Sequence, residues 1–150
     1  IREKIIENKK NFLNLFKRYM KFANIIKLSD EDLKFLSNYK NEKIIISKWI
    51  KKYSLSALIL TKGKKGAILY TKKYSISEKA RKTNIIDTVG AGDTFSAGII
   101  SYLEKKKLLN LKKINDIPKK DWAKALRFAN TIASINCSRE GCNPPKINLV

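Results

Sequence analysis

The stretch Asp87-Thr88-Val89-Gly90-Ala91-Gly92-Asp93-Thr94-Phe95 carries the most specific information on fold and function in this chain. It places a glycine-bearing turn directly before an apolar run, 95–103, which predicts a mostly buried helix. The first N–H groups of a helix have no partner inside it and lie at the positive end of its dipole. The stretch therefore predicts an anion-binding turn at a helix start.

Two glycines and one carboxylate define the chemistry of this turn. Gly90 and Gly92 carry no Cβ, so the backbone can approach a ligand closely. A carboxylate at Asp93 would repel a bound phosphate, unless it takes a proton from a hydroxyl group while the turn binds the phosphoryl group being transferred. The simpler alternative is a first-turn acid that only stabilises the helix.

The bulk composition is that of a globular domain. The chain has 150 residues, of which 43% are hydrophobic, and it contains no apolar run of about 18 residues that could span a membrane. Its first residues lack the apolar core of a secretory signal, so we expect a cytoplasmic protein without membrane contact. Because the chain opens without Met inside a helical pattern, we also expect it to be the tail of a longer protein.

The charge balance is strongly basic, with 33 Lys and Arg against 13 Asp and Glu and a net charge of +20. Such a charge raises the possibility of nucleic-acid binding. The basic residues are mostly lysines spread over the whole chain, without an Arg-rich arm, zinc finger or helix-turn-helix spacing. Specific nucleic-acid binding is therefore not favoured, although a non-catalytic basic domain that binds nucleic acid or a partner protein is the alternative from another class.

Histidine is absent, so the general base of any reaction must be Asp, Glu, Lys or Tyr. Cys137 and Cys142 match neither a metal-ligand spacing nor a C-x-x-C redox pair. They are interpreted as reduced thiols.

The hydrophobic pattern predicts helices that alternate with short strands. The predicted helices are 3–22, one opening at 29–32, about 42–53, the helix after the motif, and about 119–136; the predicted strands are 24–28, 57–61, 67–70, 73–76 and 83–86. This order predicts an α/β fold with a largely parallel sheet and no internal repeat or linker.

Three further features each allow a structural and a functional interpretation. The segment from Thr61 to Gly66 follows a strand and is either a hairpin turn or an edge of a nucleotide site. Ser29 and Asp32 form a helix capping box, or Asp32 helps to hold a hydrated Mg²⁺. Asn130 is either a surface amide or a contact to an adenine edge, and the sequence alone does not decide.

Several segments, taken together, resemble the ribokinase-like (PfkB) carbohydrate kinases. In the family's order stand Asn-Ile-Ile-Lys-Leu-Ser-Asp-Glu-Asp-Leu (24–33), the Thr-x-Gly-x-x-Gly turn (61–66), the opening motif (87–95), Ala-Leu-Arg-Phe-Ala-Asn (125–130) and Cys-Ser-Arg-Glu-Gly-Cys-Asn-Pro-Pro (137–145). The phrase at 27–33 and the Gly-x-Asn-Pro-Pro ending look most like the fructokinase branch.

The resemblance covers the whole chain but only the C-terminal half of the family domain. It implies that residues 1–150 form the nucleotide-binding half of a three-layer α/β/α domain, with the sugar-binding half and lid outside this chain. A half-domain leaves sheet edges and apolar faces uncovered, so we expect poor activity in isolation.

Carried over residue by residue, the resemblance assigns roles to matching positions. Asp93 becomes the catalytic base beside the sugar, and the backbone of Gly90, Ala91 and Gly92 becomes the anion hole. The remaining implied roles are nucleotide binding for Thr61, Gly63, Gly66 and Asn130; monovalent cation binding for Asp87, the Val89 carbonyl and carbonyls near Asn136, Arg139 and Gly141; and sugar contact for Arg2, as the last residue of a D-P-N-x-R motif. Ser29 and Asp32 lie where the family has the Asn and Glu of its N-x-x-E motif. Because both residue types differ from the motif, the resemblance does not fix a Mg²⁺ role for Asp32.

The function implied by this resemblance is ATP-dependent phosphorylation of a sugar hydroxyl, with fructose as the favoured acceptor. Ribose, 2-keto-3-deoxygluconate and a nucleoside are the alternatives within the family. The implied cofactors and ligands are ATP, Mg²⁺ and K⁺, and the whole protein is a candidate homodimer.

Overall fold

The computed structural model describes residues 1, 5–37 and 41–146. Its elements follow the predicted alternation of helices and strands. They are α1 (Lys9–Met20), β1 (Ile25–Ser29), α2 (Asp30–Leu36), α3 (Glu42–Lys52), β2 (Ala57–Thr61), the short 3-10 helix η2 (Gly63–Lys65), β3 (Ala67–Tyr70), β4 (Ser75–Glu78), α4 (Ala91–Lys105) and α5 (Lys119–Cys137).

The four strands form one sheet in the order β1-β2-β3-β4. β1 and β2 are parallel, whereas β3 is antiparallel to both β2 and β4. The prediction of a largely parallel sheet is therefore wrong for the described strands, and the sheet is mixed. The reason is the length of the connections: a parallel crossover needs about a dozen residues or more, and the chain between β2 and β3 has only the η2 turn.

The fifth predicted strand, 83–86, does not form. Its residues are exposed, and the N–H groups of Ile86 and Asp87 donate to the Cys137 carbonyl at 2.8 and 3.2 Å rather than to a neighbouring strand. This segment is instead a loop that leads into α4 and is fastened to the C-terminal end of α5.

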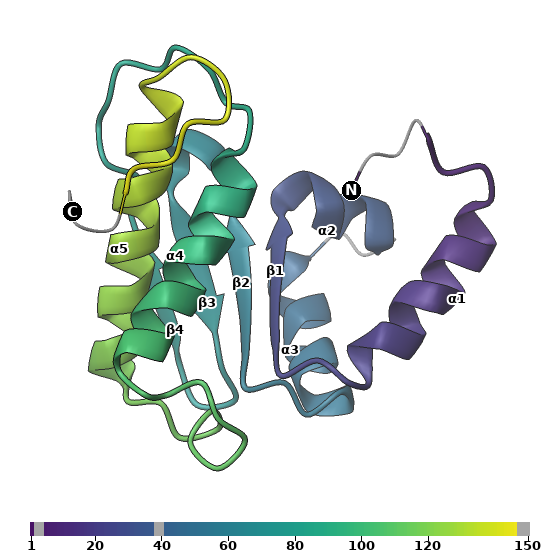
Figure 1. Ribbon diagram of the computed structural model, residues 1–150. Coiled ribbons are helices and arrows are strands. Elements are labelled where there is room, and N and C mark those ends of the chain that lie inside the picture. The colour runs from purple at the N-terminus through teal and green to yellow at the C-terminus, as the bar shows by residue number, and fades with distance from the viewer. Residues whose placement is uncertain (2–4, 38–40, 147–150) are drawn as a thin grey trace.

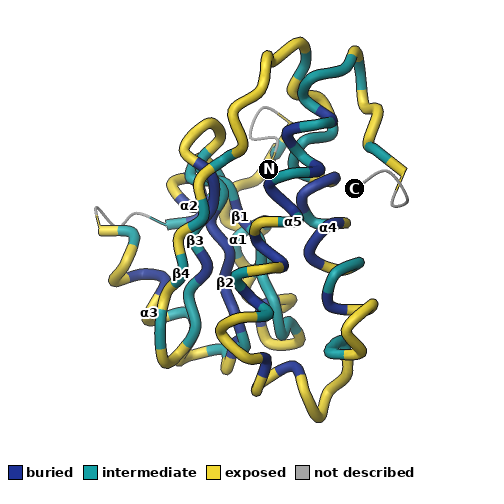
Figure 2. The backbone as a smooth tube through the Cα atoms, turned by 90° about the vertical axis from the view of Figure 1, so that its left-hand side faces the viewer, coloured by how far each residue is buried: buried dark blue, intermediate teal, exposed yellow. Residues whose placement is uncertain are grey.

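Helices cover both faces of the sheet, which gives the expected three layers. α4 and α5 lie on one face, and α2 and α3 with α1 outside them lie on the other (Figure 1). β2 divides two hydrophobic cores, because Ala57 and Ile59 point into one and Leu58 and Leu60 into the other. Figure 2 shows these buried strands at the centre of the chain, between layers whose outer surfaces are exposed.

α4 and α5 pack closely at a glycine. A Cβ on Gly98 would lie 2.8 Å from the Ala129 Cα and 2.7 Å from the Ile132 Cδ1, distances that real Cβ atoms do not adopt. Small residues at this crossing therefore let the two helices approach, and the close packing fixes the start of α4 relative to the end of α5.

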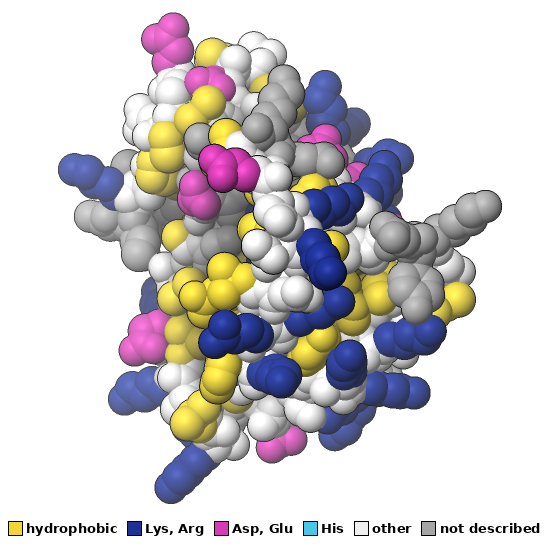
Figure 3. Space-filling view, turned by 90° about the vertical axis from the view of Figure 1, so that its right-hand side faces the viewer, with side chains coloured by type: hydrophobic (Ala, Val, Ile, Leu, Met, Phe, Trp, Pro, Cys, Tyr) yellow, Lys and Arg dark blue, Asp and Glu magenta, His cyan; other side chains and the backbone are white. Residues whose placement is uncertain are grey.

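The outer helix α1 is shorter than the predicted helix 3–22. Asn8 is the N-cap of α1, because its side chain accepts a hydrogen bond from the Asn11 N–H at 3.0 Å. On the side of the molecule that carries α1, Figure 3 shows basic side chains interleaved with hydrophobic ones.

None of the helices that the structure describes is long and apolar enough to cross a membrane.

Candidate active site at the start of helix α4

The segments singled out by sequence gather at one edge of the sheet. The parallel strands β1 and β2 point toward this edge, and α4 begins there (Figure 1). Thr61 ties the two strand ends together, since its hydroxyl donates to the Leu28 carbonyl at 3.3 Å. In open α/β sheets, ligands bind outside the carboxyl ends of the strands, so this edge is the expected place for a site.

Gly90 sets the geometry of the turn before α4. Its φ of 74° and ψ of 0° lie in the left-handed region, which glycine adopts without a steric penalty. A Cβ at this position would also lie 2.1 Å from the Cys142 sulfur. A glycine is therefore needed both for the backbone conformation and for the approach of the C-terminal loop.

The backbone N–H groups at this helix start are largely free. The Ala91 N–H donates to the Thr88 carbonyl at 3.2 Å, and the regular helix bonds begin with the Thr94 N–H, which donates to the Gly90 carbonyl at 2.8 Å. Among the residues that the structure describes, the N–H groups of Gly90, Gly92 and Asp93 donate no hydrogen bond, and no side chain caps the helix. The predicted anion hole consists of the N–H groups of Gly90, Ala91 and Gly92. In the structure the Ala91 N–H is already bonded, and the free N–H group of Asp93 takes its place.

The carboxylate of Asp93 is available for chemistry. The residue is exposed in the first turn of α4, and its side chain has no hydrogen bond or ion pair within the described ranges. An acid in this position stabilises the helix dipole. It can also accept a proton from a group that approaches the turn.

Asp87 joins the loop before α4 to the loop after α5. Its Oδ1 accepts from the Val89 N–H at 2.9 Å and its Oδ2 accepts from the Gly141 N–H at 3.0 Å. The Val89 N–H is the main group that holds the pKa of Asp87 below its usual range, with the N–H groups of Gly141 and Thr88 assisting. The predicted cation residues are therefore brought together by direct hydrogen bonds.

Asn136 supplies an unsatisfied acceptor beside the same loop. Its side chain is fully buried, and Nδ2 donates to the Val89 carbonyl at 2.8 Å. Its Oδ1 is buried without a hydrogen-bond partner among the described residues. A buried acceptor normally has a partner, and a cation ligated by oxygen atoms would provide one. This observation fits a monovalent cation near Asp87, Val89 and Asn136.

Ser29 and Asp32 form the predicted capping box. The Ser29 hydroxyl accepts from the Asp32 N–H at 3.0 Å, and Asp32 Oδ2 accepts from the Ser29 N–H at 2.9 Å. Asp32 Oδ1 contacts the ammonium group of Ile1. Partial burial raises the pKa of Asp32, but the ammonium group and the Ser29 hydrogen bonds outweigh it, and the net shift is downward.

The capping box limits how Asp32 can serve Mg²⁺, because it engages Oδ2 of the carboxylate. No group of three or more acidic, Cys or His side chains that could hold a metal ion occurs in the described part of the chain. Asp32 could therefore supply at most one carboxylate to the water shell of a Mg²⁺ ion.

Two of the four predicted nucleotide residues, Gly66 and Asn130, lie against one backbone segment, 78–80. A Cβ on Gly66 would lie 2.1 Å from the Glu78 carbonyl oxygen, and Gly66 has a φ of 95°. Asn130 is buried, and its Nδ2 donates to the carbonyls of Glu78 and Lys79 at 3.2 and 3.3 Å. Gly63 also has a positive φ, but the space around it is open. Gly66 and Asn130 thus have structural partners inside the protein.

Comparisons with known proteins identify the family of this chain. Residues 2–148 match the pfkB family of carbohydrate kinases. The chain belongs to this family. A fructokinase from Rhizobium leguminosarum bv. trifolii is 32% identical over 114 residues, which cover 76% of this chain and 35% of that protein. This chain therefore spans about a third of the length of that pfkB relative.

Solved structures of pfkB-type kinases share the fold. A fructokinase double mutant from Vibrio cholerae O395, in a fructose-, ADP- and potassium-bound form, gives a TM-score of 0.79 at 21% identity and covers 95% of this chain and 43% of that one. An aminoimidazole riboside kinase from Salmonella enterica, complexed with aminoimidazole riboside and an ATP analog, gives 0.79 at 24% identity and covers 95% and 45%. These likenesses establish a ribokinase-like α/β architecture for this pfkB chain.

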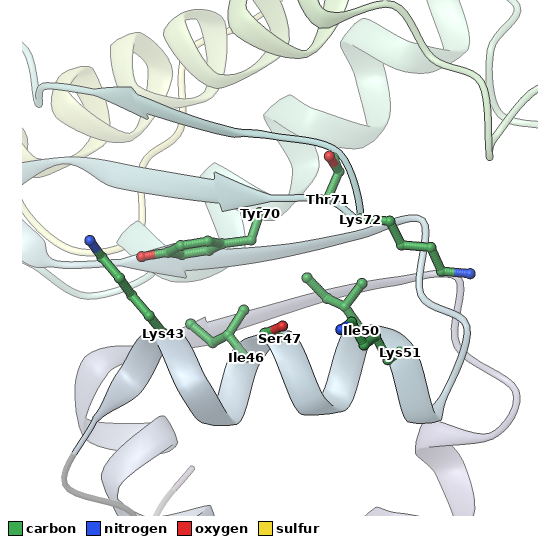
Figure 4. Close-up of a pocket in the computed structure, with 8 residues that line it drawn as sticks. All are labelled: Lys43, Ile46, Ser47, Ile50, Lys51, Tyr70, Thr71 and Lys72. Atoms are coloured by element: carbon green, nitrogen blue, oxygen red, sulfur yellow. The ribbon is translucent and has the colours of Figure 1, made fainter.

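One pocket of the described residues lies away from the family motif. It measures about 80 Å³ and lies between α3 and the end of β3, as Figure 4 shows. Its lining residues are Lys43, Ile46, Ser47, Ile50, Lys51, Tyr70, Thr71 and Lys72. None of the predicted site residues lines it, so it is no part of the candidate site. Arg2 lies outside the described residues.

Two features of the edge were not predicted from sequence. The segment 78–80 carries no motif, and its role depends only on what packs against it. The second feature is Lys27 on β1, whose ammonium group lies close to the start of α4. A Cβ built on Gly92 would lie 2.9 Å from the Lys27 Nζ. The sequence offered one signal for it, a lysine within an apolar strand.

Proposed function

We propose that this chain is the nucleotide-binding part of an ATP-dependent sugar kinase, with fructose as the favoured acceptor. The observation that supports this best is the start of α4, where the Asp93 carboxylate and neighbouring backbone N–H groups have no partner in the described part of the chain. Membership of the pfkB family and the fructokinase relatives support the choice of reaction and acceptor.

In the proposed reaction, Asp93 accepts the proton of the acceptor hydroxyl while its oxygen attacks the γ-phosphorus of ATP. The new bond joins the sugar oxygen to phosphorus, and the bond from phosphorus to the β-phosphate oxygen of ADP breaks and leaves its electron pair there. The N–H groups at the start of α4 donate to the oxygens of the transferred group and stabilise their charge.

The roles of the cofactors follow from the same contacts. Mg²⁺, when bound, neutralises charge on the phosphates, and Asp32 is the residue of this chain that would hold its water shell. For K⁺, the fitting residues are Asp87, the Val89 carbonyl and Asn136, whose Oδ1 has no partner among the residues that the structure describes. Fixing these residues would order the turn that carries the free N–H groups.

The nucleotide end of the proposed site is built on the 78–80 segment. Gly66 and Asn130 hold this segment against the turn after β2, and we propose that ATP lies along the resulting edge with its phosphates toward α4. The Thr61 hydroxyl is engaged with β1 in the described state, so its proposed contribution is the placement of this turn.

A kinase assay on the complete gene product that contains this chain tests the proposal. Fructose, ribose, 2-keto-3-deoxygluconate and a nucleoside are offered separately with ATP and Mg²⁺, and phosphorylated product is measured with and without K⁺. We expect the highest kcat/KM with fructose. Higher kcat/KM with another acceptor would correct the substrate, whereas transfer to none of them would overturn the kinase assignment.

A further inference from the structure

Lys27 occupies a position in β1 where an apolar side chain is expected. β1 alternates between the two faces of the sheet, and Ile25 on the same face packs against the core beneath α4 and α5. The strand partner of Lys27 is Ile59, which is only 1% exposed. The stem of a charged residue therefore lies in an apolar row, which is unfavourable unless the charge has a use.

The ammonium group of Lys27 lies against the start of α4. A Cβ on Gly92 would be 2.9 Å from Nζ, so the absence of a side chain at Gly92 leaves room for this group. Lys27 is half-buried and has no hydrogen bond or ion pair among the residues that the structure describes. Asp93, one residue beyond Gly92, is not within ion-pair distance of it.

The ammonium group of Lys27 and the positive end of the α4 dipole thus lie close together, with no anionic side chain of the described residues bonded to either. The start of a helix carries the equivalent of about half a positive charge, and the free N–H groups of Gly92 and Asp93 concentrate it here. A lysine that points at this end is electrostatically unfavourable by itself. A bound phosphoryl group would remove the conflict, because it would accept hydrogen bonds from the N–H groups and from the ammonium group together.

From this geometry we infer that Lys27 binds the phosphoryl group being transferred and neutralises the charge on its oxygens as it leaves ADP. The inference rests on the proposed kinase function. It adds a side-chain cation to an anion hole otherwise made of backbone N–H groups. Because Nζ lies beside Gly92, whose free N–H group would bind the transferred group in the proposed reaction, we assign Lys27 to the γ-phosphoryl group of ATP.

The decisive variant is Lys27→Met in the complete gene product, because methionine keeps an unbranched apolar stem and removes the charge. Lys124→Met is the matched control, since Lys124 is exposed on α5 and the change in net charge is the same. Lys27→Arg keeps the charge with a different shape, and Lys27→Gln replaces the Met variant if that variant does not fold.

We expect Lys27→Met to lower kcat by about 100-fold, with the KM for the sugar unchanged, because a charge-assisted contact in the transition state is lost. In calorimetric titrations, affinity for a non-hydrolysable ATP analogue should fall about tenfold or more, whereas affinity for ADP should change less than about threefold. Lys27→Arg should recover part of the lost kcat, and Lys124→Met should behave as wild type.

Two results would overturn the inference. One is a Lys27→Met variant that equals Lys124→Met in kcat and in analogue affinity. The other is an equal loss of affinity for ADP and for the analogue, which would place Lys27 on the phosphates that ADP retains. If the wild-type protein phosphorylates no sugar, the kinase proposal fails, and the analogue titration still decides whether Lys27 binds a terminal phosphate.

Discussion

The two ends of the candidate site differ in whether their polar groups have bonding partners within the protein. At the start of α4, the carboxylate of Asp93, the N–H of Gly92 and the ammonium group of Lys27 have no partner among the described residues. At the turn after β2, Gly66 packs on the 78–80 backbone and Asn130 donates two hydrogen bonds to it.

This difference separates two kinds of site residue. Groups without a bonded partner contribute little to the stability of the folded chain and remain available to bind a ligand. Groups with internal partners stabilise the fold and shape the site through the backbone they hold. Substitutions at the α4 end should therefore change activity without changing stability, and substitutions at the β2 end should change stability first.

The largest effect is expected for Asp93→Asn. Removing the base should lower kcat by a factor of about 10²–10⁴, while stability changes by less than about 1 kcal/mol, since only the favourable charge at the helix start is lost and the side chain bonds to no described residue. ATP binding should survive. Steady-state kinetics and thermal unfolding of the complete gene product measure both quantities.

The matched control for this variant is Asp121→Asn, because Asp121 is the first-turn acid of α5. Both substitutions remove one favourable charge from a helix start, but only the one at Asp93 should abolish turnover. A rate above about a tenth of wild type for Asp93→Asn would remove Asp93 from the role of general base.

The next effect concerns the two glycines of the turn after β2. Gly66→Ala should destabilise the protein by about 1–3 kcal/mol or more, because it combines a positive φ with a Cβ that would meet the Glu78 carbonyl at 2.1 Å. Gly63→Ala is the control, since it has a positive φ but open space around it. It should cost only about 1–2 kcal/mol. Equal losses in chemical denaturation would show that contact with 78–80 is unimportant.

Asn130→Ala should destabilise the protein by about 1–3 kcal/mol, because a buried side chain is lost and the carbonyls of Glu78 and Lys79 lose their donor. The KM for ATP should rise as a consequence, through movement of the 78–80 segment. If the KM for ATP rises several-fold in Asn130→Ala while the free energy of unfolding is unchanged, Asn130 does not act by stabilising the fold. In that case the amide would act on the nucleotide directly.

The smallest effect is the pH dependence of the Asp87 contacts. The folded-state pKa of Asp87 is depressed, so its stabilising contacts are fully present above the unfolded pKa of about 3.9 and are lost as pH falls through the lower folded value. Hydrogen exchange at the Val89 and Gly141 amides should therefore lose protection below about pH 4. Asp87→Asn should remove this pH dependence, and persistence of it in that variant would assign it to another group.

Local pattern was enough to predict much of the fold. The strand at 57–61 is observed with the predicted bounds, and the helix predicted at about 119–136 is observed as Lys119–Cys137. The capping box at Ser29 and Asp32 is also confirmed. In each case the signal lies within a few neighbouring residues: continuous apolar character, i, i+3, i+4 spacing, or side chains that bond to the backbone three residues away.

The errors arose where pairing partners decide the structure. Residues 83–86 have strand character, but Ile86 bonds to the end of α5, and the short turn after β2 makes β3 antiparallel. Residue type alone could not show that Asn130 would be buried against 78–80, because that depends on the approach of α5 to the end of β4.

The sequence by itself determined the family, the three-layer architecture and the chemistry offered by the start of α4. These follow from a contiguous motif whose glycines, carboxylate and helix signal lie within a few residues. Only the tertiary structure decided which of those groups are free and which are used. It brought Lys27 to Gly92, Asn136 to Val89 and Asn130 to Glu78. Such contacts depend on how strands and helices pack over long sequence separations, which no local pattern specifies.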